Sequence, residues 1–103
     1  MASAKATIVY SHITKDPEVC GGRACIDGTR IRVADIACLQ REGYAPERML
    51  EVYPSLNLAQ VHAALSYYYE NPQEIDSALQ EDREVAQKIE SDRANFLRNR
   101  PAR

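Results

Sequence analysis

The last third of the chain contains no helix-breaking residue between Pro72 and Pro101. Proline and glycine most often end a helix, so this stretch predicts one helix over about 72–98, about 40 Å long. Asn71 and Glu74 favour the same start, because asparagine caps helices and an early acid meets the positive end of the helix dipole. A polar helix of this length needs a partner surface to be stable.

Turn-forming residues divide the preceding sequence into three shorter helical stretches. Gly43 and Pro54 separate apolar side chains at helical spacing over about 33–42, 45–52 and 58–69. On the third stretch, the residues expected to face the core are Leu58, Val61, Leu65 and Tyr68.

The segment from Ala24 to Val33 predicts a short β-hairpin. Asp27-Gly28 favours a type I′ turn, whose twist matches paired strands, and β-branched residues flank it. Such short strands need to pack on the helices to be stable. The expected fold is mainly α. It has a β-hairpin and a three-helix, helix-turn-helix core over 1–70, and a C-terminal helical extension over 71–103.

Hydrophobic residues make up 45% and charged residues 27% of the chain, which is typical of a soluble globular protein. No apolar run approaches the roughly 20 residues that cross a bilayer, and the first residues lack the pattern of a secretory signal. We therefore expect a cytoplasmic protein without membrane association, whose three cysteines are reduced thiols.

The formal net charge of −2 hides an uneven distribution. Residues 70–92 carry eight acidic and two basic side chains, whereas residues 93–103 carry four arginines and no acid. A globally basic nucleic-acid-binding protein is excluded, but a local cationic face is not.

Three short helices with an apolar stripe on the third are typical of a helix-turn-helix unit. The start of the third helix then enters the major groove, where amides pair with adenine edges and arginines contact phosphates. The predicted DNA-binding residues are Arg48, Asn57, Gln60, His62, Arg30 and Arg32. Such a protein would act as a homodimer, because one small module reads too few bases for tight specific binding.

The same pattern is typical of any small helical bundle, so a protein-interaction or dimerisation module without a DNA-binding role is the alternative. Metal binding is not expected, because Cys20 and Cys25 lack the second ligand pair that structural zinc uses. Cys38 lies among apolar helix neighbours and is expected in the core. We find no nucleotide-binding or metalloprotease motif and expect no cofactor and no enzymatic activity, a cysteine site of unrecognised type being the remaining enzymatic alternative.

The C-terminal helix carries a thin apolar stripe, which Asp82 and Arg93 interrupt. The stripe can dock in a partner's groove, or the helix can stay solvated and be stabilised by pairs such as Glu84–Lys88. The three tyrosines over 67–69 offer one ring to the core, and the others either pack under this helix or form a protein interface. The predicted partner-binding residues are Ile75, Leu79, Ala86, Ile89 and Phe96.

Short motifs follow one another in order along the chain. They are Asp16-Pro17-Glu18-Val19-Cys20-Gly21-Gly22, Ile26-x-Gly28-Thr29-Arg30-Ile31-x-Val33, Tyr53-Pro54-x-Leu56 and Ala63-Ala64-Leu65-x-Tyr67-Tyr68. Together they resemble the bacterial family catalogued as domain of unknown function 433. The resemblance spans about residues 8–75, with Ala24 where the family usually has proline.

The resemblance implies a homeodomain-like three-helix core behind a small β element. Many members look like VapB-type antitoxins of type II toxin–antitoxin pairs, and their partners are often small toxins with a PIN-like nuclease fold. By this resemblance, the helix-turn-helix would bind the promoter of its own operon and residues 72–98 would hold the toxin. Among the residues that carry the resemblance, Gly22, Gly28, Thr29 and Arg30 are expected to have structural roles, with Arg30 bracing the hairpin against the helices.

Overall fold

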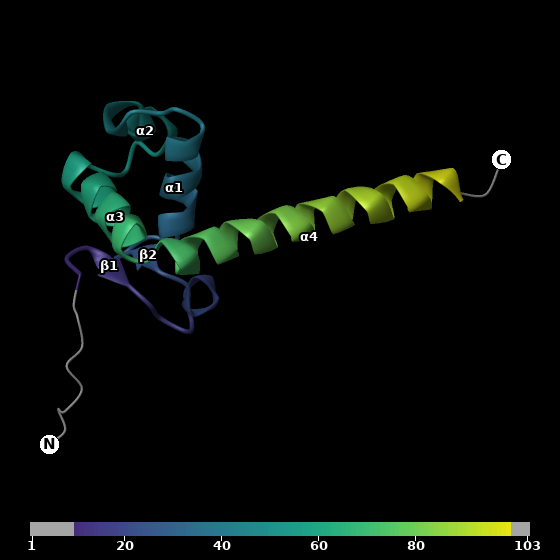
Figure 1. The fold of residues 1–103 in the computed structure, drawn as a ribbon, viewed down its shortest axis with the longest axis horizontal. Helices are drawn as coiled ribbons and strands as arrows, with labels where there is room; N and C mark the ends of the chain where they lie inside the picture. Colours follow the sequence, from purple (N-terminus) through teal and green to yellow (C-terminus); the bar gives the residue numbers. More distant parts are fainter. Residues whose placement is uncertain (1–9, 100–103) are drawn as a thin grey trace, which may run out of the picture.

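A computed structural model describes residues 10–99, which form four α-helices and a two-stranded antiparallel sheet. In chain order the elements are β1 (Ile13–Thr14), the 3-10 turn η2 (Cys20–Gly22), β2 (Cys25–Ile26), α1 (Val33–Arg41), α2 (Pro46–Val52), α3 (Leu58–Glu70) and α4 (Pro72–Arg98). The elements from β1 to α3 form a compact part, from which α4 projects (Figure 1). The predicted mainly helical class, with a small β element before the helices, is confirmed.

The β element pairs differently from the predicted hairpin. β1 lies antiparallel to β2, with Ile13 opposite Ile26 and Thr14 opposite Cys25. The segment after the turn contributes only a single antiparallel bridge, between Cys25 and Arg32. The main sheet partner of β2 therefore comes from upstream in the chain.

The turn after β2 also differs from the predicted type I′ turn. Among the described residues, Gly28 has a positive φ of 80° but Asp27 does not, and this combination is that of a type II turn. Thr29 closes the turn, because both its backbone N–H and its hydroxyl donate to the carbonyl oxygen of Ile26, at 3.0 and 2.8 Å.

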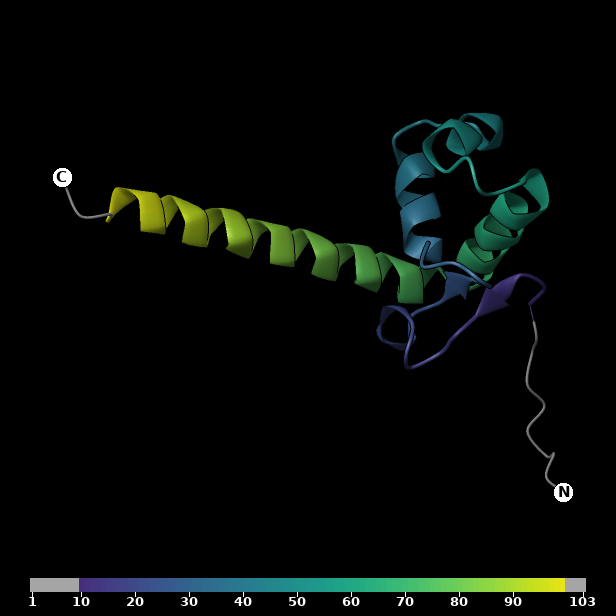
Figure 2. The same cartoon turned by 180° about the vertical axis from the view of Figure 1, so that it is seen from behind.

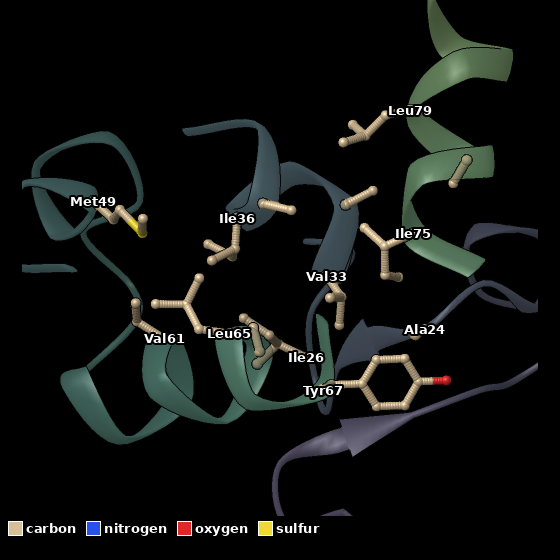
Figure 3. Packing of buried hydrophobic residues seen from close by; sticks show 14 of the residues in the cluster. Ala24, Ile26, Val33, Ile36, Met49, Val61, Leu65, Tyr67, Ile75 and Leu79 are labelled. Atoms are coloured by element: carbon tan, nitrogen blue, oxygen red, sulfur yellow. The ribbon is translucent and has the colours of Figure 1, made fainter. Parts of the chain in front are cut away.

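One hydrophobic core joins the β element to all the described helices (Figure 3). Ile26 of β2, Ile36 of α1 and Met49 of α2 are fully buried within it. From α4, the core takes Ile75, Ala78 and Leu79. The first turns of α4 therefore share the core of the part predicted over residues 1–70.

The buried face of α3 is rotated from the predicted one. Its buried residues are Val61, Ala64, Leu65 and Tyr67. Leu58 is exposed, so the prediction is wrong at this position, whereas Tyr68 is half-buried and packs against the core as predicted. Tyr67 turns inward because the ring of Tyr10 packs edge-on against it, with centroids 4.7 Å apart, and its hydroxyl donates to Glu74 at 2.8 Å.

The two asparagines at helix starts behave differently. Asn57 caps α3 as predicted, accepting from the Gln60 backbone N–H at 2.9 Å, while the Gln60 side chain accepts from the Asn57 N–H at 2.8 Å. Asn71 precedes α4 but makes no side-chain capping bond there. Its amide instead donates to the Tyr67 carbonyl at 3.1 Å and to the Tyr10 hydroxyl at 3.3 Å, so it ties the end of α3 to the start of the described chain.

Replacing Ile36 tests the core. Ile36 is fully buried, so we expect Ile36→Ala to lower the free energy of unfolding by about 2–5 kcal/mol through lost contacts and a residual cavity. Urea unfolding followed by circular dichroism measures this value. Val52 is 43% exposed, so Val52→Ala should change it by less than about 0.5 kcal/mol. Equal effects of the two changes would contradict the described packing.

Candidate functional site

α4 divides into two parts with different surroundings. Its root, residues 72–82, packs against α1 and α3. Every side chain over 83–98, the outer half, is exposed, and this half is about 24 Å long. Figure 2 shows from behind how far it extends beyond the compact part. Despite its length, α4 is not apolar enough to cross a membrane, and neither is any other helix of residues 10–99.

Ion pairs hold the root of α4 against the compact part. Every acidic side chain of the root has a basic partner there, and the pairs are Glu74–Lys15 at 3.0 Å, Asp76–Arg41, Glu81–Arg23, and Asp82–Arg32 at 2.8 Å. Each surface pair contributes little alone, but several pairs distributed around one helix restrict its direction. The acid-rich sequence thus serves, in its first part, as an internal contact rather than as a solvated face.

Arg32 makes the most extensive of these contacts. Its guanidinium donates to both carboxylate oxygens of Asp82, at 2.8 and 3.3 Å, and to Asp35 at 2.8 Å. Its backbone N–H also donates to Asp35, at 2.9 Å, which closes the start of α1. Hydrogen bonds to Asp82 and Asp35 raise the pKa of Arg32, so its guanidinium stays positively charged. Arg32 is therefore engaged in joining α1 to α4, and it, rather than Arg30, braces this region.

Tyrosines add hydrogen bonds to the same junction. The Tyr67 hydroxyl donates to Glu74 at 2.8 Å, and the Tyr68 hydroxyl donates to Asp76 at 3.1 Å. Burial raises the pKa of Tyr67, so its hydroxyl stays a donor at neutral pH. Tyr69 is 61% exposed. Two arrangements are expected for the tyrosines other than the core-facing Tyr68, and Tyr67 adopts the first of them, packing beneath the start of α4.

The outer half of α4 carries apolar side chains on the face that the root buries. Val85, Ile89 and Phe96 continue the line of Ile75 and Ala78 at helical spacing, yet they are 58%, 62% and 67% exposed. Single exposed apolar residues are ordinary, whereas a row of them on one face is typical of an interaction surface. We call this row the outer stripe; its members are Val85, Ala86, Ile89, Phe96 and Leu97.

The predicted partner-binding residues are divided between the two parts of α4. Ile75 and Leu79 are buried in the core, at 3% and 6% exposure. Their side chains are therefore covered by the protein's own compact part. Ala86, Ile89 and Phe96 are exposed and belong to the outer stripe.

The predicted DNA-contact residues of α2 and α3 lie on a surface with little positive charge. Arg48 is exposed, but its Nε lies 3.4 Å from Glu51 and its guanidinium lies over the Tyr44 ring, 5.2 Å from the centroid. His62 is exposed on α3. Residues 46–70 contain this single arginine and three glutamates, so the attraction of this surface for phosphates is weak.

The other predicted DNA-contact residues have structural contacts of their own or lie elsewhere. Asn57 and Gln60 use their side-chain oxygens to cap α3. Arg32 is bound at the α4 junction. Arg30 is exposed and lines a shallow depression beside the turn after β2, together with Asp16 and other residues.

The described residues contain no group of three or more His, Cys, Asp or Glu side chains that could hold a metal ion. Cys20, Cys25 and Cys38 are free thiols. Burial raises the pKa of Cys25 to about 12, so this thiol is protonated at neutral pH and is a poor nucleophile. Cys38 packs at the edge of the core and is half-buried, where burial also raises its pKa.

Comparisons with known proteins identify the family. The family model described as "Protein of unknown function (DUF433)" matches residues 13–68, more than half of the chain, and the chain therefore belongs to this family. A crystal structure of a DUF433 member protein from Anabaena variabilis is 36% identical, with a TM-score of 0.63, over 67% of this chain and 68% of that chain. The outer half of α4 lies beyond the family match.

An uncharacterized protein of Sinorhizobium fredii, y4eO, is 38% identical over 60 residues. These residues are 58% of this chain but only 27% of that protein. The chain thus spans about a quarter of the length of this relative.

Replacing Arg32 tests the junction. Arg32→Gln leaves Asp35 and Asp82 without their cation, so we expect the free energy of unfolding to fall by about 1–3 kcal/mol. We also expect faster amide hydrogen exchange over residues 72–82. Arg48→Gln, in the exposed pair with Glu51, should change the free energy by less than about 0.5 kcal/mol. Chemical unfolding and exchange mass spectrometry measure both effects, and indistinguishable variants would refute the assigned role of Arg32.

Proposed function

We propose that the protein acts by binding other proteins, without catalysis, and that the outer half of α4 is its docking element. The outer stripe is the observation that carries this proposal. Val85, Ile89 and Phe96 expose more than half of their surface and share one side of α4. The ribbon of α4 extends well beyond the compact part (Figure 1). An amphipathic helix laid in a partner's groove is a recurring mode of protein recognition.

The ion pairs of the root support this proposal. They hold the start of α4 against the compact part, so its direction is set before a partner arrives. A docking element whose direction is already fixed at its root loses less orientational freedom on binding than one attached through a flexible linker.

The resemblance to antitoxins gives the proposal a specific form. In this form the partner is a toxin with a PIN-like fold, which the protein neutralises by covering it with α4. The family match ends at residue 68, so the whole of α4 lies outside the part that the family model describes.

DNA binding through a helix-turn-helix formed by α2 and α3 is a second proposal. Arg48 and His62 are exposed, and the capping bonds of Asn57 and Gln60 use their oxygens but not their amide nitrogens. The excess of glutamates over 46–70 works against phosphate binding. We therefore favour protein binding.

Changing the outer stripe tests the docking element. The full chain should co-purify with the protein encoded by the neighbouring reading frame, and Ile89→Glu combined with Phe96→Glu should abolish recovery, because charges replace the apolar contacts. Gln87→Glu combined with Ser91→Glu adds the same charge to the opposite face of α4 and should leave recovery unchanged. Equal recovery with both double variants would refute the assignment, and a PIN-like nuclease as the co-purified protein would support the antitoxin form.

Changing α2 and α3 tests DNA binding separately. With DNA from upstream of the gene, Arg48→Ala combined with His62→Ala should weaken binding about tenfold or more in a gel-shift titration. Arg83→Ala removes a positive charge from α4 and should have no such effect. Gln60 is left intact because its side chain also caps α3. If the parent chain does not bind this DNA at low salt, the DNA-binding proposal is refuted and the protein-binding proposal is unaffected.

A further inference from the structure

We propose that the occupant of the outer stripe is the outer half of α4 from a second copy of this chain, with the two helices antiparallel. This inference rests on the proposed function in its general form, protein binding through the outer half of α4, and it assigns that docking element a second copy of the chain in place of a PIN-like toxin. The compact part, the spacing of the stripe and the flanking charges each support it.

The compact part limits where a second helix can lie. Ile75 and Ala78 of the root are buried on the same face that Val85 and Ile89 expose further along α4. A helix laid on this face therefore contacts only residues 83–98. In a parallel pair, the compact part of the second copy would lie beside the root of the first, where the compact part of the first copy already packs. In an antiparallel pair, the two compact parts lie at opposite ends.

The spacing of the outer stripe fits an antiparallel pair. If residue 83 of one copy faces residue 98 of the other, Val85 faces Phe96 and Ile89 faces Asp92, in both directions. These positions alternate as the a and d sites of a coiled-coil seam. The medium-sized side chain of Val85 then packs against the large side chain of Phe96 in two layers. The two Ile89 side chains lie in adjacent layers on either side of the two-fold axis.

Asp92 is the polar member of this seam. Its carboxylate lies 3.2 Å from Lys88 Nζ of the same helix. Each of the two layers beside the two-fold axis therefore contains one Asp92 carboxylate, which Lys88 of the same helix pairs with, and the apolar layers are the two outer ones, between Val85 and Phe96.

The charges beside the seam distinguish the two directions. Lys88 and Arg93 occupy the g and e sites, which face each other in a parallel coiled coil, so a parallel pair would place like charges together twice. An antiparallel pair instead puts Arg93 beside Ala86 and within reach of Glu90 of the second copy. Electrostatics and the position of the compact part thus favour the same direction.

Sedimentation of the full chain tests the pairing. Each copy contributes about four helical turns, so we expect a monomer–dimer equilibrium with a dissociation constant on the order of micromolar. Ile89→Glu combined with Phe96→Glu should weaken dimerisation at least about tenfold, and Gln87→Glu combined with Ser91→Glu should not. A parent chain that is monomeric well above micromolar concentration, or a dimer insensitive to the stripe variant, would overturn the proposal.

Cross-linking tests the direction. A mixture of Val85→Cys and Phe96→Cys chains, distinguishable by mass, should form the mixed disulfide between residues 85 and 96 under mild oxidation. Each variant alone should give no more cross-linked product than the parent chain, whose native thiols set the background. Disulfides joining residue 85 to 85 or 96 to 96 would show a parallel pair and overturn the proposal.

The outcomes separate this inference from the proposed function. A monomeric chain that still captures the neighbouring-frame protein through the outer stripe would overturn the second-copy inference and leave the proposed function standing. A monomeric chain that captures no such protein would overturn both.

Discussion

The contact of the Arg32 guanidinium with Asp35 and Asp82 is the interaction on which the arrangement of the molecule depends. It joins the segment after β2, the start of α1 and the root of α4. Burial of the apolar face of the root supplies attraction but little direction, because the hydrophobic effect is non-directional. Hydrogen bonds between a planar guanidinium and carboxylates have a fixed geometry. They therefore set the direction in which α4 leaves the compact part, and with it the placement of the outer stripe.

The helices follow from local signals, and the main differences arise from non-local contacts. Pro46, Asn57 and Pro72 mark helix starts that depend only on neighbouring residues, so α2, α3 and α4 begin where the sequence predicts. The pairing of β1 with β2 joins segments separated by the η2 turn, and no turn signal encodes it. Tyr67 faces inward because of Tyr10 and Glu74, whose positions depend on the tertiary fold.

The sequence predicts only part of the candidate site, because local spacing determines which residues share a helix face but non-local contacts determine which of them are covered. Periodicity correctly places Ile89 and Phe96 on one face of α4, and the same spacing would have added Val85, which lies four residues before Ile89. Periodicity cannot tell whether an apolar residue is covered by the protein's own core or left for a partner, so it predicts Ile75 and Leu79 as partner-binding residues although the core covers both. Sequence likewise gives the charge of Arg32 but not Asp82, its partner fifty residues along the chain.

The continuity of α4 across the edge of the compact part has a thermodynamic consequence. Without an occupant, the outer half has only its own backbone hydrogen bonds and a few side-chain pairs to keep it helical, so it unwinds from Arg98 inward at low cost. Unwinding stops near Asp82, where the tertiary contacts begin. An occupant that binds only the helical form suppresses this fraying by mass action. The helicity of the outer half of α4 therefore depends on the concentration of its occupant.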